Sequence, residues 1–290
     1  MRDFVIMTDS CCDLTAELAA ELQLDIQPLT LRLNGKDFLN YLDGREIGFK
    51  EFYDCMRAGA LGTTSAVSVG DFEESMRPIL AAGKDILYVG FSSALSTTYQ
   101  SSVIAAEALR EEFPDAVILT ADSKCASMGQ GLLVYLCAQQ KKAGKSLQEV
   151  YDFCMETIPH LCHWFTVDDL NHLKRGGRVS AATALVGTML AIKPVLHVDD
   201  EGRLINVSKA RGRKASLLAM VDNMEKTAIN PADQTVFISH GDCLKDAQFV
   251  AGEIEKRFGT KDIRINYVGP VIGNHTGAGV VALFFLGNQR

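Results

Sequence analysis

The amino-acid sequence predicts an α/β fold built as two domains, residues 1–160 and 161–290. Short apolar runs alternate with helix-like stretches through the first half of the chain, which is the pattern of a parallel sheet covered by helices. A length of 290 residues suits one large domain or two ordinary ones. A new unit of strand and turn begins after residue 160, so we place the boundary there and expect a mixed sheet in the second domain.

The elements of the first domain follow from its periodicity. Residues 3–10 read as a buried strand, and residues 13–24 as an amphipathic helix that Asp13 can cap. Asn34-Gly35 lies between alternating apolar and polar residues, which is a strong hairpin signal. Functional groups of such a sheet are expected where its strands end. The other expected elements are strands over 85–93 and 116–123, a helix after each strand, a helix that begins near residue 71, and a closing helix over 146–160.

The second domain is expected to begin with a strand that runs from residue 162 into a basic, glycine-rich turn, LKRGGRVS. A turn at Asp200-Glu201-Gly202 divides the strand-like residues 194–210 into a pair. The closing run GPVIGNHTGAGVVALFF places His275 in a glycine-rich turn, which suggests a close approach of the backbone to another group. The other expected elements are helices over 181–191, 211–227 and 246–258 and strands over 235–241 and 263–273.

Composition excludes several classes of function. The formal net charge of -7 argues against a nucleic-acid surface, which normally needs a basic patch. No apolar run approaches the roughly 18 residues that span a bilayer, so we expect no transmembrane segment and leave a transient membrane contact open. Without a secretory signal or a CxxC pair, we expect a cytoplasmic protein with reduced thiols. The segment HLCHW lacks the spacing and fourth ligand of a zinc site, and we expect neither metal nor cofactor.

The stretch GFSSALSTTYQSS, residues 90–102, carries seven serine and threonine hydroxyls just after a predicted strand. We expect the next helix to begin at residues 93–95, so Ser92 and Ser93 would join the free amides of its first turn in binding an anion. Helix capping alone would explain one hydroxyl or two. A nucleophile is the third interpretation, because GFSSA resembles G-x-S-x-G except in its last position. His240 at a strand end could then serve as the base of a serine-dependent lipid or ester hydrolase of α/β type, but no acidic partner is evident.

Two further groups of residues suit an anionic ligand, with a solvated loop or surface turn as the alternative interpretation of each. The loop Gly62-Thr63-Thr64-Ser65 supplies neutral hydroxyl donors and lacks the Gly-Lys-Ser/Thr ending of a nucleotide P-loop. Basic residues gather in LKRGGRVS and in KARGRK. In an acidic protein, such patches are suited to a phosphate or to an acidic partner surface.

Taken together, these motifs resemble those of the DegV family of bacterial lipid-binding proteins, in the family's order and over nearly the whole chain. MTDSCCDL resembles the family's TDSxxDL opening, TTSAVS its TSQPS loop, and FSSALSTTYQSS its SSxLSGTYQSA segment. ADSKCASMGQG resembles its DSxxxSMGxG run, LKRGGRVS with KPVLHVDDEGRL its central segment, and GPVIGNHTGAGVVALFF its closing one. The chain departs from the family where TSAVS lacks a glutamine and a proline and where LSTTY lacks a glycine.

The resemblance implies a two-domain α/β protein that holds a long-chain fatty acid between its domains. It also implies that the protein is a carrier rather than an enzyme. Members of this kind present the acid to a separate fatty acid kinase, which makes an acyl phosphate for phospholipid metabolism. Arg178 in the GGR turn, with Arg175, would serve this partner or the phosphoryl transfer. The residues that the resemblance assigns to the fatty-acid carboxylate are Thr64, Ser65, Ser92, Ser93 and His275.

Overall fold

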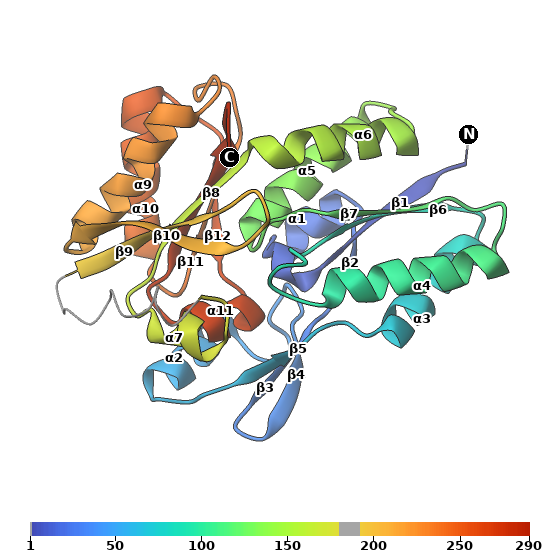
Figure 1. The fold of residues 1–290 in the computed structure, drawn as a ribbon, viewed down its shortest axis with the longest axis horizontal. Coiled ribbons are helices and arrows are strands. Elements are labelled where there is room, and N and C mark those ends of the chain that lie inside the picture. The colour runs from blue at the N-terminus through green and yellow to red at the C-terminus, as the bar shows by residue number, and fades with distance from the viewer. Residues whose placement is uncertain (1, 180–191) are drawn as a thin grey trace.

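Parallel and mixed sheets, with helices on both faces, make up the fold, and the predicted α/β class is confirmed (Figure 1). The computed structural model describes residues 2–179 and 192–290, and the helix expected over 181–191 lies outside these residues. Within the described ranges no helix is long and apolar enough to cross a membrane. The domain boundary at residue 160 stays a prediction.

The first sheet is entirely parallel, with strand order β2-β1-β6-β7. Every residue of β6 is buried, as expected for a parallel strand that is covered on both faces. Helices α3 (Val69–Ala81) and α4 (Thr98–Glu112) pack together on this sheet. The four strands are β1 (Phe4–Asp9), β2 (Asp25–Gln27), β6 (Asp85–Gly90) and β7 (Ile118–Asp122).

The second sheet is mixed, with strand order β10-β9-β8-β13-β11-β12. Among the described residues of this sheet only β11 and β12 pair in parallel, and the other neighbours are antiparallel. Helices α9 (Arg213–Thr227) and α10 (Leu244–Phe258) pack on each other and on this sheet (Figure 1). The six strands are β8 (Leu161–Thr166), β9 (Ile192–Val198), β10 (Leu204–Arg211), β11 (Val236–His240), β12 (Ile263–Tyr267) and β13 (Val281–Leu286).

Helix α5 (Met128–Lys142) lies between the two sheets and contacts strands of both (Figure 1). Its first residues are buried on all sides, and two glycines allow the close approach. A Cβ atom at Gly129 would lie 2.8 Å from the Phe284 ring, and one at Gly131 would lie 2.5 Å from the carbonyl oxygen of Cys12. One apolar core therefore runs from the parallel sheet across α5 to the mixed sheet. Helix α6 (Leu147–Thr157) packs beside α5.

A small antiparallel sheet completes the fold, with strand order β4-β3-β5. The predicted hairpin is confirmed: β3 and β4 meet at Asn34 and Gly35, whose φ angles are 51° and 77°. The Thr-Thr-Ser segment, expected as a loop, forms β5 instead and pairs with β3. Helix α2 (Phe49–Arg57), which was not predicted, packs near the last helix of the chain. The strands are β3 (Thr30–Leu33), β4 (Lys36–Leu39) and β5 (Thr63–Ser65).

Two helix starts differ from the prediction. Helix α1 (Ala16–Glu21) is capped by Thr15, whose hydroxyl accepts from the Leu18 amide, and not by Asp13, whose backbone is left-handed. Helix α4 starts at Thr98, because Ser96 accepts the Thr98 amide at 3.2 Å and closes a turn before it. Residues 92 and 93 therefore lie in a loop and not in a helical first turn.

The end of the chain also differs, because residues 270–273 are helical rather than extended. Helix α11 (Pro270–Thr276) begins with proline at its first position, where the missing N–H is harmless. His275 therefore lies in the last turn of a helix, and Gly277 follows with a φ of 78°. Helix α7 (Asn171–Arg175) packs against α11 and leads into the GGR turn.

Candidate functional site

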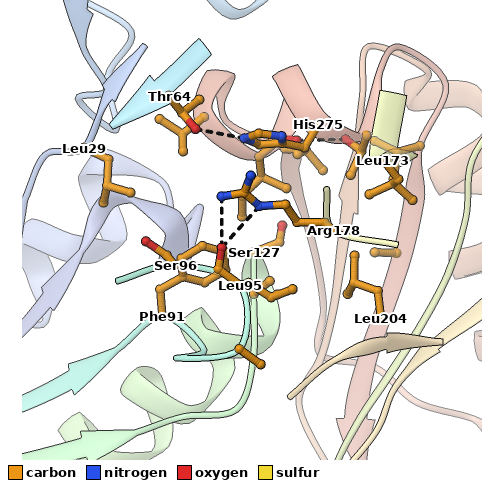
Figure 2. A pocket seen from close by; sticks show the side chains of 18 of the residues that line it. Leu29, Thr64, Phe91, Leu95, Ser96, Ser127, Leu173, Arg178, Leu204 and His275 are labelled. Atoms are coloured by element: carbon orange, nitrogen blue, oxygen red, sulfur yellow. Dashed lines mark hydrogen bonds between the residues drawn. The ribbon is translucent and has the colours of Figure 1, made fainter. Parts of the chain in front are cut away.

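A cavity of about 380 Å³ lies where the two sheets, β5 and α11 meet. This volume falls within the range of small-molecule sites. Residues from both halves of the chain line the cavity, and most of its wall is apolar. Representative apolar lining residues are Leu29, Phe91, Leu95 and Leu204, which Figure 2 labels, together with Phe165 and Ile272.

A second, more polar cavity of about 400 Å³ adjoins the first. Thr64, Arg178 and His275 line both cavities, so they form the boundary between an apolar chamber and a basic one. We call this second, basic cavity the outer cavity. Of the two cavities, Arg175 lines only the outer one, where its Nη2 lies 2.9 Å from Nδ1 of His172. The outer cavity thus offers positive charge beside the boundary.

Thr64 and His275 are in direct contact at this boundary (Figure 2). The Thr64 hydroxyl lies 2.8 Å from Nε2 of His275. Burial, with Arg178 nearby, lowers the pKa of His275 to about 4, so the imidazole is neutral at neutral pH. A side chain at Gly176 would collide with Nδ1 of His275, and the glycine there lets the GGR turn approach the ring.

Asn274, the neighbour of His275 on α11, holds the β5 segment in place. Its Oδ1 accepts from the Gly62 amide at 3.0 Å, and its Nδ2 donates to the Gly62 carbonyl at 3.0 Å. A Cβ atom at Gly62 would lie 2.6 Å from Oδ1, so the paired contact requires glycine at this position. These two bonds set the position of Thr64, two residues further along the chain.

Arg178 connects the GGR turn to residues 91–97, the loop between β6 and α4 that we call the serine loop (Figure 2). Its Nε and Nη2 donate to the Leu95 carbonyl at 3.2 and 3.1 Å, and Nη1 donates to the Gly176 carbonyl. Burial lowers the pKa of Arg178 from its ordinary value, although the group stays charged. In the described ranges no carboxylate forms an ion pair with Arg178, so its charge at the boundary is available to an anionic ligand.

Ser92 and Ser93 have different surroundings. Ser92 is fully buried, donates to the Gly202 carbonyl at 2.9 Å, and is absent from the described residues that line the cavity. Ser92 therefore fastens the loop to the β9–β10 turn, and a direct contact of its hydroxyl with a ligand stays a prediction. Ser93 lines the cavity, and its hydroxyl and amide both donate to the Asp122 carboxylate. Ser65 also lines the cavity and is exposed.

A buried carboxylate behind the serine loop was missed as a site-forming group. Asp9 ends β1, and its Oδ2 accepts from the Tyr88 hydroxyl at 2.8 Å, the Phe91 amide at 2.9 Å and Gln130 at 3.1 Å. Burial raises the pKa of Asp9 above its ordinary value. The opening TDS motif therefore shapes the loop that carries Ser92 and Ser93. The sequence signal that could have identified Asp9 is its position at the end of a predicted strand.

The contacts of the serines do not match a nucleophilic site. Within the described ranges neither Ser92 nor Ser93 is hydrogen-bonded to a histidine. His240 accepts the Cys243 amide at 3.3 Å and packs against the Tyr267 ring. No group of three or more histidine, cysteine or acidic side chains in the described ranges could hold a metal ion.

Comparison with known proteins places these features in a family. A family model described as "Uncharacterised protein, DegV family" matches residues 3–288. A DegV domain-containing protein of Clostridium perfringens is 46% identical over 290 residues, covering 100% of this chain and 99% of that protein.

Solved structures share the fold over the same length. A DegV family protein from Thermus thermophilus, described by its fatty acid binding, is 29% identical with a TM-score of 0.86, over 98% of this chain and 99% of that chain. The fatty acid kinase (Fak) B3 protein of Streptococcus pneumoniae, loaded with linoleic acid, is 22% identical with a TM-score of 0.84, over 98% of this chain and 99% of that chain. The second likeness is one of fold alone.

Proposed function

The chain belongs to the DegV family, and we propose that it binds a long-chain fatty acid in the apolar cavity between its sheets. The observation that carries this proposal is the cavity itself, apolar over most of its wall and bordered at one boundary by hydroxyls, Arg178 and His275. The proposed carboxylate site consists of Thr64, Ser65, Ser93 and His275, while Ser92 positions the loop. A cytoplasmic location and the division at residue 160 belong to the same proposal.

Burial of the alkyl chain supplies the affinity. About 16 carbons, at roughly 0.8 kcal/mol for each buried CH₂, contribute more than ~10 kcal/mol before the losses of entropy on binding. Burial of the carboxylate opposes binding unless several donors meet it. The hydroxyl groups of Thr64 and Ser65 on β5 can supply these donors, and Ser93 can add one when its hydroxyl turns from the Asp122 carboxylate to the ligand.

The protonation state of His275 favours this arrangement. A neutral imidazole with its proton on Nε2 donates to Thr64 Oγ1, which leaves the hydroxyl hydrogen of Thr64 free to donate to the ligand. Neutral donors hold a carboxylate without a tight ion pair, and a carrier must release the group again. Arg178 adds its charge nearby, while its donors remain on backbone carbonyls.

We further propose that the protein presents the carboxylate to a fatty acid kinase that forms an acyl phosphate. Thr64, Arg178 and His275 face both cavities, so a carboxylate at this boundary is reachable from the outer one. The transferred phosphoryl group would occupy the outer cavity near Arg175 and Arg178, where positive charge offsets its own. The hydrolase alternative finds no support in the contacts of Ser92 and Ser93.

Calorimetric titration of the delipidated protein tests the proposed binding. Palmitate is expected to bind with one site per chain, and palmitate methyl ester about tenfold or more weakly, because it lacks the charged acceptor. Equal affinities would place the carboxylate elsewhere, and no binding of either compound would refute the proposed function. Addition of a purified fatty acid kinase and ATP, with hydroxylamine to trap acyl phosphate, tests the presentation step. Absence of product with a kinase active on another carrier would refute that step.

A further inference from the structure

A hydrogen-bonded chain of polar side chains reaches the wall of the apolar cavity. Ser127 Oγ lies 2.6 Å from Asp13 Oδ2 and 2.8 Å from Ser239 Oγ. Ser127 and Ser239 line the apolar cavity and are absent from the described lining of the outer one. All three side chains are buried. The carboxylate site of the proposed function uses none of them.

Ser239 is the last side chain in this series of hydrogen bonds, and Ser127 is its side-chain partner. Burial, with Asp9 nearby, raises the pKa of Asp13 to about 8, so its carboxyl group holds a proton at neutral pH. With that proton on Oδ2, the oxygen that faces Ser127, Asp13 donates to Ser127 and Ser127 donates to Ser239. The Ser239 hydroxyl hydrogen is then left without an acceptor among the described residues. With Asp13 ionised the order reverses, and Ser239 Oγ becomes an acceptor without a donor.

The wall around Ser239 leaves room for a ligand group. On the mixed sheet Ser239 pairs with Ala282, and Ala282 pairs with Phe165. All three line the cavity, and the small Ala282 stands between the two larger neighbours. His163 is a second buried polar side chain of this wall, and burial holds its pKa well below the ordinary value.

A plain alkyl chain would leave Ser239 with Ser127 as its one side-chain hydrogen-bond partner among the described residues, and a buried hydroxyl whose remaining donor or acceptor is unused is unfavourable. We propose that the preferred ligand is a fatty acid with an oxygen substituent on its chain, a hydroxy or oxo acid, whose oxygen is hydrogen-bonded to Ser239. This inference rests on the proposed function and specifies its ligand class. The direction of the hydrogen bonds through Asp13 and Ser127 can reverse. Ser239 can therefore donate to a ligand carbonyl or hydroxyl in one order, and accept from a ligand hydroxyl in the other.

Competition titrations with stearate and a series of hydroxystearates test this inference. The series carries the hydroxyl near the carboxylate, at mid-chain or at the far end. For the native protein we expect at least one hydroxystearate to bind about five- to tenfold more tightly than stearate. Ser239→Ala should remove this preference with little change for stearate, and Ser102→Ala, a buried serine outside the described cavity lining, should keep it.

A second variant covers the case in which Ser239→Ala does not fold. Ala282→Val keeps Ser239 and fills the space beside it, so it too should lose the preference. Native protein that binds no hydroxystearate more tightly than stearate would overturn the inference and indicate that water satisfies Ser239. A preference that survives both substitutions would overturn it as well. Failure of stearate itself to bind would instead count against the proposed function.

Discussion

The Thr64 hydroxyl lies 2.8 Å from Nε2 of His275, although the two residues are 211 positions apart in the sequence. This contact joins the small sheet to α11 at the boundary between the apolar and the basic cavity. The adjacent pair of bonds between Asn274 and Gly62 fixes the two segments in register. A ligand carboxylate placed here would meet donors from segments that fold together only in the complete chain.

Removal of hydroxyl donors is expected to weaken fatty-acid binding. The double variant Thr64→Ala/Ser93→Ala should bind palmitate about a hundredfold more weakly, because two donors to a charged acceptor are lost. Calorimetry on delipidated protein measures this effect. Ser101→Ala, on α4 and outside the described cavity lining, is the matched control. Normal binding by the double variant would show that the carboxylate lies elsewhere.

Replacement of Arg178 should separate binding from phosphorylation. Arg178→Ala is expected to lower acyl phosphate formation at saturating fatty acid by about tenfold or more, with a change in palmitate affinity of only a few fold, because Arg178 contacts backbone carbonyls and faces the outer cavity. Arg203→Ala, an exposed arginine paired with Glu201, serves as the control. Parallel losses of affinity and turnover would contradict the proposed role.

Replacement of a small residue in the wall of the apolar cavity by a larger one should weaken the binding of long fatty acids more than that of short ones. Ala126 lines the cavity, and Ala126→Leu is expected to weaken stearate binding about tenfold while laurate binding changes less, because the added side chain takes space from the distal carbons. Ala105→Leu crowds a buried position of α4 outside the described lining and controls for general loss of stability. Equal effects of Ala126→Leu on both acids would argue against an alkyl chain in this cavity.

The raised pKa of Asp13 predicts a pH-dependent difference in stability. The folded pKa is about 8 and the ordinary value 3.8, so the folded state holds a proton that the unfolded state loses within this window. The contribution of Asp13 to stability is therefore greatest at acid pH and falls as the pH rises, by up to about 1.4 kcal/mol per pH unit.

Asp13→Asn lacks this titration. Its free energy of unfolding relative to the native protein should rise from about pH 4 to about pH 8. Urea unfolding at several pH values measures this difference. Buried histidines such as His275 titrate with the opposite sign, but they are common to both proteins and cancel in the comparison. A difference that does not change with pH would mean that Asp13 is ionised in the folded protein.

Local periodicity was sufficient to predict much of the fold. The strand over 3–10 and the hairpin at Asn34-Gly35 follow from patterns of a few residues, and both are confirmed. The start of α4 was misplaced, because Ser96 closes a turn before it that serine-rich sequence does not distinguish from a helical first turn.

Long-range contacts account for what the sequence could not reveal about the site. The difference between Ser92 and Ser93 depends on Gly202 and Asp122, which approach the loop only in the folded chain. Likewise, the polar chain that ends at Ser239 needs Asp13 and Ser127 from two distant motifs. Motif order indicated which segments meet, but not which hydroxyl faces the cavity.

Lipid extraction of the purified protein, followed by mass spectrometry, tests the central claim most directly. The account predicts about one long-chain fatty acid for each protein chain, and much less in Thr64→Ala/Ser93→Ala. Absence of any fatty acid, together with covalent labelling of Ser92 or Ser93 by a serine-hydrolase probe, would contradict it.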